Sequence, residues 1–302
     1  MRIKPKAVGG QAVIEGVMMK GAEDISIAVR KPDGEIVVKK EKLKSSRKKI
    51  SKIPIIRGIF AFVDSMVIGV KSLLYSAEFV DVEDEREKKK PSKLDEFMEK
   101  NVIWVSVVIS IVFSVGLFIL LPTVLVGLLK SYTDNTLILN GIEGIVRLTI
   151  FLSYIAAISQ MKDIRRVFEY HGAEHKSIFC YEHGEELTVE NVRKYGRLHP
   201  RCGTSFLFIV MMVSILLFSL FNWSGVFMRL LIRILLIPIV AGISYEIIKW
   251  AGRSQNKLSC AVSAPGMWLQ KLTTREPDDK QIEVAVEALK NVIVADPEAD
   301  DW

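Results

Sequence analysis

The chain has 302 residues, half of them hydrophobic, and 41 lysines and arginines against 35 aspartates and glutamates, which gives a formal net charge of +6. Its apolar residues gather in runs long enough to cross a bilayer, which points away from a soluble globular protein and toward an integral membrane protein. The positive-inside bias of membrane proteins accounts for the basic excess. Since no RNA-binding aromatic signature accompanies it, we expect no nucleic-acid partner.

Residues 1–53 are predicted to form a small β-rich cytoplasmic unit. Ile25–Val29 and Glu35–Val38 flank Lys31-Pro32-Asp33-Gly34, a sequence typical of a hairpin turn. The preceding glycine-rich run, Gly9–Met19, predicts turns or a close approach of the backbone to another group. Its spacing does not match a dinucleotide-binding fingerprint, because no strand–glycine–helix context surrounds it.

Residues 54–79 predict an amphipathic helix that lies in the membrane interface or re-enters it. Four charged residues recur every seven positions and share one face: Arg57, Asp64, Lys71 and Glu78. This face is either solvated or lines a polar groove in the membrane. A full crossing would place Lys88–Lys90 outside, against the charge rule. Residues 80–100 are predicted to be a charged linker.

Residues 101–251 predict a membrane bundle of about four spanning helices, so the fold class is mainly α. Two of the four candidate spans, 101–129 and 204–228, carry no charge. The other two, 145–161 and 229–250, carry charges near their ends, and we expect Arg147 and the arginines of 229–250 to snorkel to the interface. No helix-breaking residue separates Lys162 from Gly172, so the span 145–161 is expected to continue as one helix through His175.

The basic residues of the loops set the expected topology. The loop 162–203 is rich in lysine and arginine, as are both terminal regions, whereas the links 130–144 and 222–226 are not. We therefore expect a multi-pass protein of the cell membrane with both termini and this loop in the cytoplasm. No apolar run follows Met1–Lys6, so we expect no cleaved signal peptide. The tail, 252–302, is predicted to contain an amphipathic helix over 277–294.

The loop 162–203 holds the motif that carries chemistry, His171-Gly172-Ala173-Glu174-His175. Histidines at positions i and i+4 lie on one face of a helix, with their Cβ atoms about 6 Å apart, and can ligate one metal ion. Glu174 is a candidate general base, because the order His-x-x-Glu-His inverts the zinc-protease signature. Such pairs also arise by chance, and a histidine beside arginines can instead contact lipid phosphates.

Further candidate ligands are expected at the same membrane surface. His199 and Cys202 come just before the third span, and either is a candidate third ligand of a divalent metal, expected to be zinc. Glu246 and Glu15 are additional candidates. The alternatives are that Cys202 is a small buried residue and that Glu246 pairs with a basic residue of its own helix. The cysteines all fall on the expected cytoplasmic side, so we expect no disulfide.

Four motifs together resemble the bacterial YqhQ family, a domain of unknown function labelled a predicted metal-dependent enzyme. They are Gly9–Met19, Tyr170–Lys176, His199–Ser205 and Thr273–Asp279. The resemblance covers nearly the whole chain. It implies an integral membrane protein and agrees with a histidine metal site, but it supplies neither a substrate nor a reaction.

Two classes of function remain open at this point. The first is a metal-dependent hydrolase in which Glu174 acts as base on a membrane-associated substrate. The second is a non-catalytic membrane-protein biogenesis factor, chaperone or lipid-handling protein, in which the histidine–cysteine cluster is structural. The expected partners are membrane lipids and membrane-embedded or nascent polypeptides. A metal with three protein ligands and an open position favours the first class, and four protein ligands favour the second.

Overall fold

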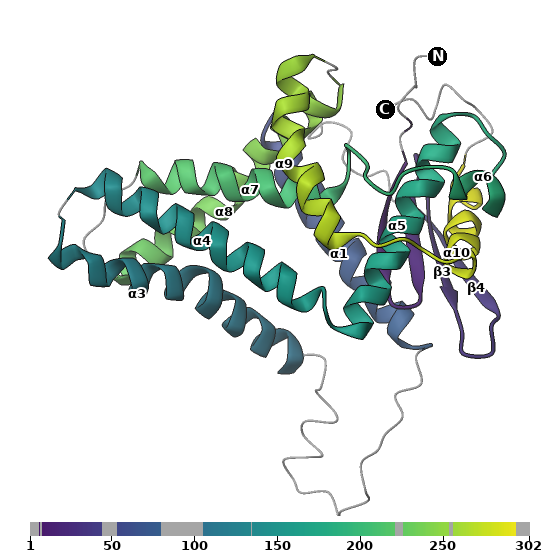
Figure 1. Cartoon of the computed structure of the whole chain (residues 1–302), viewed down its shortest axis with the longest axis horizontal. Helices are drawn as coiled ribbons and strands as arrows, with labels where there is room; N and C mark the ends of the chain where they lie inside the picture. Colours follow the sequence, from purple (N-terminus) through teal and green to yellow (C-terminus); the bar gives the residue numbers. More distant parts are fainter. Residues whose placement is uncertain are drawn as a thin grey trace, which may run out of the picture. The chain divides into compact units, whose positions relative to one another are not determined.

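The computed structural model describes residue 6 and residues 8–43, 53–79, 105–133, 135–220, 226–253 and 256–293 (Figure 1). The linker expected at 80–100 lies outside the described residues. The chain is mainly helical with one small antiparallel sheet. It divides into two compact units, the first made of Met1–Asp81, Ile155–Ser214 and Leu236–Trp302 and the second of Val82–Tyr154 and Ile215–Leu235.

The sheet has four strands in sequence order. They are β1 (Gly9–Val13), β2 (Gly16–Lys20), β3 (Asp24–Arg30) and β4 (Ile36–Lys42). β3 and β4 pair antiparallel around the turn in which Gly34 has φ 92°, which confirms the predicted hairpin. The glycine-rich run forms a second hairpin of β1 and β2, closed by Ile14 and Glu15.

The two faces of the sheet pack against different helices. One face contributes Val17 and Met19 to a core shared with α5 (Lys162–Glu182) and α10 (Asp279–Lys290). On the other face, Met18, Ile27 and their neighbours pack with Ile68 and Tyr75 of α1 (Ile56–Ala77). The predicted N-terminal region is therefore not a separately packed body, because helices from the middle and the end of the chain complete its core.

Two predicted helix boundaries are wrong, each because a capping position intervenes. α4 (Thr136–Ile158) ends before α5, and Met161 between them is extended with ψ 135°, so the helix that carries the histidines is not a continuation of the span. The tail helix does not begin at Pro277. Asp278 caps α10 by accepting from the backbone of Gln281, whose side chain in turn accepts from the backbone of Asp278.

Among the described residues, four helices are long and apolar enough to cross a membrane, and they are compatible with a multi-pass protein: Ile56–Ala77, Val105–Gly127, Ile138–Ile158 and Leu231–Arg253. The number agrees with the expected four spans, but the members differ. α1 meets the criterion, although we expected it not to cross. α7 (Gly203–Ser219) has 17 residues. At about 1.5 Å per residue it is about 26 Å long, shorter than a hydrocarbon core of about 30 Å.

In the second unit, two arginines expected to snorkel turn inward instead. Arg233, which belongs to α8 (Val226–Arg253), donates to Glu143 at 2.6 Å and to Thr123 at 2.7 Å. Arg147 donates to the same carboxylate at 2.5 Å. The expectation is wrong here because an acidic partner on α4 is within reach, and a paired charge costs less inside a bundle than an unpaired one.

Candidate metal centre

α5 places three ionisable side chains on one face. His171, Glu174 and His175 stand at positions i, i+3 and i+4 of this helix. The Nδ1–H of His171 donates to the carbonyl oxygen of Thr273 at 2.8 Å, and that of His175 donates to the carbonyl oxygen of Arg197 at 2.5 Å. Both bonds hold the proton on Nδ1, so the lone pair of each Nε2 is left for another partner.

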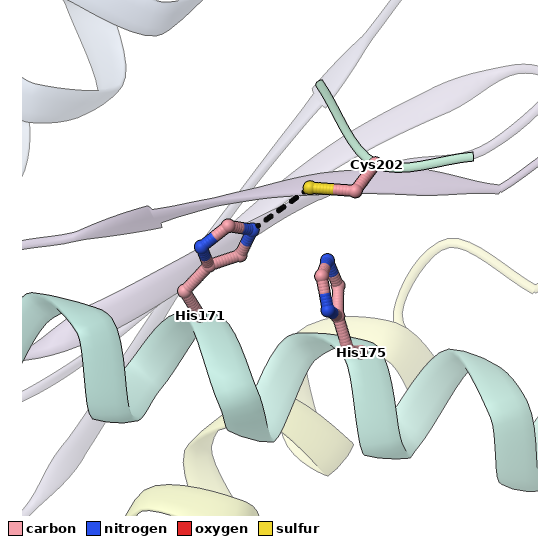
Figure 2. Close-up of side chains that lie close together, drawn as sticks. All are labelled: His171, His175 and Cys202. Atoms are coloured by element: carbon pink, nitrogen blue, oxygen red, sulfur yellow. Dashed lines mark hydrogen bonds between the residues drawn. The ribbon is translucent and has the colours of Figure 1, made fainter. Parts of the chain in front are cut away.

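Cys202 faces the histidine pair from the N-terminus of α7. Its Sγ lies 3.2 Å from Nε2 of His171, and a dashed line in Figure 2 marks this contact. The backbone N–H of Thr204 donates to the same sulfur at 3.4 Å, and the hydroxyl of Thr204 lies 3.1 Å from it. Cysteine sulfur is among the ligands that zinc accepts in proteins.

His171, His175 and Cys202 can hold a metal ion together. One ligand atom from each lies within 4.8 Å of the other two. In a tetrahedral zinc site with bonds of about 2.0–2.3 Å, ligand atoms stand about 3.3–3.8 Å apart, so a small inward movement would suffice. His175 is buried, and within the described part of the chain its Nε2 has no hydrogen-bond partner. Such an atom is costly unless something binds it, and a cation at this point would do so.

Glu174 lies beside both imidazoles. Its Oε2 is 3.5 Å from Nε2 of His175 and 3.8 Å from Nε2 of His171. Burial raises the pKa of Glu174 and lowers that of His175, so both environments favour the neutral forms when no cation is near. A divalent cation nearby would favour the ionised form of the Glu174 carboxylate, because the positive charge of the cation stabilises the negative charge of the carboxylate.

The glycine-rich hairpin reaches this carboxylate. The backbone N–H of Gly10 donates to Glu174. A Cβ atom at position 10 would stand 2.7 Å from both Cγ and Oε1 of Glu174. The close backbone approach that the run Gly9–Met19 predicts therefore occurs at Gly10, and it brings β1 to the metal centre.

Two segments far apart in the sequence supply the carbonyl groups that orient the histidines, and side-chain hydrogen bonds hold these segments together. Gln270 of α9 (Lys257–Thr273) brackets His199, accepting from its N–H and donating to its carbonyl, both at 2.8 Å. The guanidinium of Arg197 donates to the carbonyl of Thr274. These bonds hold the loop before Cys202 against the chain after α9, and so fix the two carbonyls that orient the histidines. Sequence reasoning missed Thr273, Arg197 and Gln270; the motif Thr273–Asp279 marked only the segment.

His199 lies near the centre but outside the three-residue group. Its Nδ1 accepts from the N–H of Arg201 at 3.3 Å, and its Nε2 is 3.4 Å from Oε2 of Glu182. Its ring packs on Phe179, with centroids 4.4 Å apart. Burial lowers the pKa of His199 to about 4. With both ring nitrogens engaged, His199 is placed as a neighbour of the ligands, and Cys202 as the third member of the group.

The two additional glutamates are engaged elsewhere. Glu15 forms a two-pronged ion pair with Arg166 and lies 3.3 Å from the hydroxyl of Tyr170. Glu246 forms a two-pronged ion pair with Arg57 of α1 and accepts from the N–H of Ile55. Arginine pairing therefore occupies both carboxylates, and the structure does not bring either into the three-residue group.

A cavity of about 600 Å³ opens onto the centre. His171 and Cys202 form part of its wall, and the rest comes from β1, α1 and the start of α5 and α7. A second cavity of about 540 Å³ lies between α1, α7 and α8. The two share Gln11, Ser65, Gly203 and Leu207 as lining residues. His171 and Cys202 are therefore reached from a mostly apolar space that follows α1.

Comparison with known proteins places the chain in one family. Residues 53–295 match the family described as protein of unknown function (DUF1385). The uncharacterized protein YqhQ of Bacillus subtilis (strain 168) is 38% identical over 298 residues, which cover 96% of this chain and 93% of that protein. No solved structure matches the chain. By the family match over most of its length and by this identity, the chain belongs to the YqhQ family (DUF1385).

Proposed function

We propose that this protein is a zinc-dependent hydrolase of the cell membrane. In this proposal it spans the membrane several times, its termini and its metal centre face the cytoplasm, and its substrate is membrane-associated. His171, His175 and Cys202 would hold the zinc. The observation that carries the proposal is the buried Nε2 of His175, which has no hydrogen-bond partner among the residues that the structure describes, although Nδ1 of the same ring is fixed by a carbonyl.

The donor set favours zinc over other divalent metals. Two imidazole nitrogens and a thiolate are ligands that zinc accepts readily, whereas magnesium and calcium prefer oxygen. Three protein ligands leave one tetrahedral position open, as in catalytic rather than structural zinc sites. When bound, the cation would make a water molecule acidic enough to react near neutral pH and would polarise a substrate carbonyl.

Glu174 supplies the proton transfer in this proposal. Its carboxylate lies close to both Nε2 atoms. It would take a proton from the attacking water and deliver it to the leaving group. Gly10 keeps this carboxylate in place, because its backbone N–H donates to it. The cavity in front of His171 and Cys202 gives a substrate access to the same point.

One observation favours a second function. The distances of 3.5 and 3.8 Å from Glu174 to the two histidines are also those expected between ligands of one ion. With Glu174 as a fourth ligand, the site would be closed and structural. The protein would then be a non-catalytic factor that handles lipids or assists nascent membrane polypeptides.

Metal analysis separates these functions. Protein purified without chelators should carry about one zinc per chain by elemental mass spectrometry, and His175→Ala or Cys202→Ala should lose most of it, since even changes around the ligands cost about 10–100-fold in affinity. The exposed His183 and Cys260 provide matched controls, because His183→Ala and Cys260→Ala should keep the metal.

Glu174→Gln decides between a base and a ligand. Retained zinc with lost hydrolysis supports the hydrolase. Released zinc makes Glu174 a ligand and supports the structural site. Wild-type protein that carries no metal under these conditions overturns both versions.

A further inference from the structure

β1 is an edge strand, and it borders the cavity of the metal centre. Within the described part of the chain, β2 is the strand hydrogen-bonded to it. Gly9 and Gly10 are exposed. Four successive residues of β1, Gly9 to Ala12, line the 600 Å³ cavity together with His171 and Cys202. The main chain of an edge strand therefore lies in the same space as two of the proposed metal ligands.

Some N–H and C=O groups of β1 point away from β2 and toward this space. In an antiparallel pair, alternate residues direct their N–H and C=O groups away from the neighbouring strand. The N–H of Gly10 points away from β2, because it donates to Glu174. Ala12 is two residues further on and has the same orientation. Because Glu174 takes the N–H of Gly10, the row offered to another strand consists of the outward C=O of Gly10 and the outward N–H and C=O of Ala12, and it begins at the carboxylate of the centre.

Such a row selects a polypeptide as its ligand. An extended peptide that adds to a sheet edge matches every outward N–H and C=O with one of its own, whereas an acyl chain matches none. A lipid phosphate would need a basic cluster. The lysines and arginines that line the two cavities are Lys20 and Arg201, and Arg201 is ion-paired with the buried Glu182.

The second cavity suits the side chains of such a peptide. Phe62, Met66 and Val70 of α1 line it on one side, and Phe206 and Leu207 of α7 line it on another. Since Gln11 and Ser65 line both cavities, a strand laid along β1 would direct alternate side chains toward this apolar space. The site therefore favours a segment rich in aliphatic residues.

We propose that the substrate is an extended, apolar polypeptide segment that adds to β1 as a further strand and is cut beside Glu174. This inference rests on the proposed hydrolase function. In the reaction the oxygen of water bonds to the peptide carbonyl carbon and the C–N bond breaks. One proton of the water passes through Glu174 to the amine, so the products are a new carboxyl end and a new amino end.

A defined peptide tests this proposal on the full-length, zinc-loaded protein in detergent. The probe is a decapeptide of alternating valine and leucine with two lysines at one end for solubility and a fluorophore–quencher pair. Binding is followed by fluorescence anisotropy and cleavage by the loss of quenching and by mass spectrometry. Two matched peptides have the same sequence and are N-methylated at alternate residues, one at the odd positions and one at the even positions. Each therefore lacks the N–H donors on one edge of the extended peptide only.

On wild-type protein, one of the two methylated peptides should bind at least about fivefold more weakly than the parent, because an unpaired buried main-chain group costs about 1–3 kcal/mol. Ala12→Pro should have a similar effect on the parent peptide, since it removes the outward N–H of β1 at a position where an edge strand accepts proline. Ala12→Ser keeps that N–H and should bind as the wild type does.

Each outcome has one meaning. Equal binding of all three peptides overturns strand addition, whether or not cleavage occurs. Cleavage of phosphatidylglycerol micelles without binding of the peptide overturns the polypeptide substrate and leaves the hydrolase standing. Binding that depends on the methylation register without cleavage supports strand addition and overturns the hydrolase. If Ala12→Pro loses its zinc and so reports a damaged fold, the methylated peptides on wild-type protein decide alone.

Discussion

Gly10 of β1 and Glu174 of α5 are in contact although 164 positions separate them in the sequence. The backbone N–H of Gly10 donates to the Glu174 carboxylate, and a side chain at position 10 would stand 2.7 Å from Cγ and Oε1 of Glu174 and 2.9 Å from the carbonyl oxygen of Met18. The N-terminal hairpin is thus part of the candidate metal centre and fixes one side of its carboxylate.

Gly10→Ala is expected to impair the centre. The added methyl group meets the Glu174 side chain on one side and backbone on the other, so the carboxylate has to move. Zinc affinity or hydrolysis should fall by about 10–100-fold, as for other changes around metal ligands. Zinc titration and turnover measure this. Gly9→Ala is the matched control, because nothing lies within 4 Å of a Cβ there. Equal behaviour of the two variants would contradict the contact.

Gly172→Ala is expected to destabilise the fold, although alanine is ordinarily the better helix former by about 1 kcal/mol. A Cβ at position 172 would overlap the carbonyl oxygen of Arg275, whose N–H donates to the carbonyl of Phe168 at 2.8 Å. Overpacking of this kind costs about 1–3 kcal/mol. The thermal unfolding midpoint should therefore fall. Gly196→Ala, where a Cβ has open space, should leave it unchanged, and a rise for Gly172→Ala would refute the close crossing.

His199 is expected to make the metal-free protein less stable as the pH drops from about 6.5 to 4. Burial lowers the pKa of His199 from 6.5 to about 4, so the unfolded chain binds a proton in this range that the folded chain does not. One such proton changes the free energy of unfolding by about 1.4 kcal/mol per pH unit. Chelator-treated wild type and His199→Gln should be compared by thermal unfolding at several pH values. His175 contributes equally in both proteins to the change of unfolding free energy with pH. The prediction is therefore that stability changes less steeply with pH in His199→Gln than in the wild type.

Local features of the fold could be predicted from the sequence. The hairpin of β3 and β4 follows from the turn Lys31–Gly34, and the shared face of His171 and His175 follows from the helical repeat. Both depend only on residues close together in the chain. The nearness of Cys202 was predicted from its place beside a span, and the structure puts its sulfur 3.2 Å from His171.

The remaining parts of the centre depend on contacts that leave no local pattern. Thr273 and Arg197 orient the histidines through their carbonyl groups, and a carbonyl is present at every residue. α9 was not predicted, because Pro265 interrupts its pattern and Gln270 and Thr273 face the protein interior. Hydropathy along the sequence also does not show where an apolar helix ends: α7 has 17 residues, fewer than the apolar run 204–228, and α1 is long and apolar enough to cross despite its charged face.

The last prediction is that α1 does not cross the membrane, although its length and composition would allow it. Ile68 and Tyr75, in its C-terminal half, pack against the sheet, whose β4 is rich in lysine and exposed. The remaining residues, from Ile56 to Val67, span about 18 Å at about 1.5 Å per residue, less than the hydrocarbon core of about 30 Å. A reporter inserted in the segment 80–100 should therefore read as cytoplasmic. A cysteine at position 194 should resist an impermeant thiol reagent in intact cells, and one at position 135 should react. A reporter located outside the cell would make α1 a membrane span and would contradict the proposal that the metal centre faces the cytoplasm.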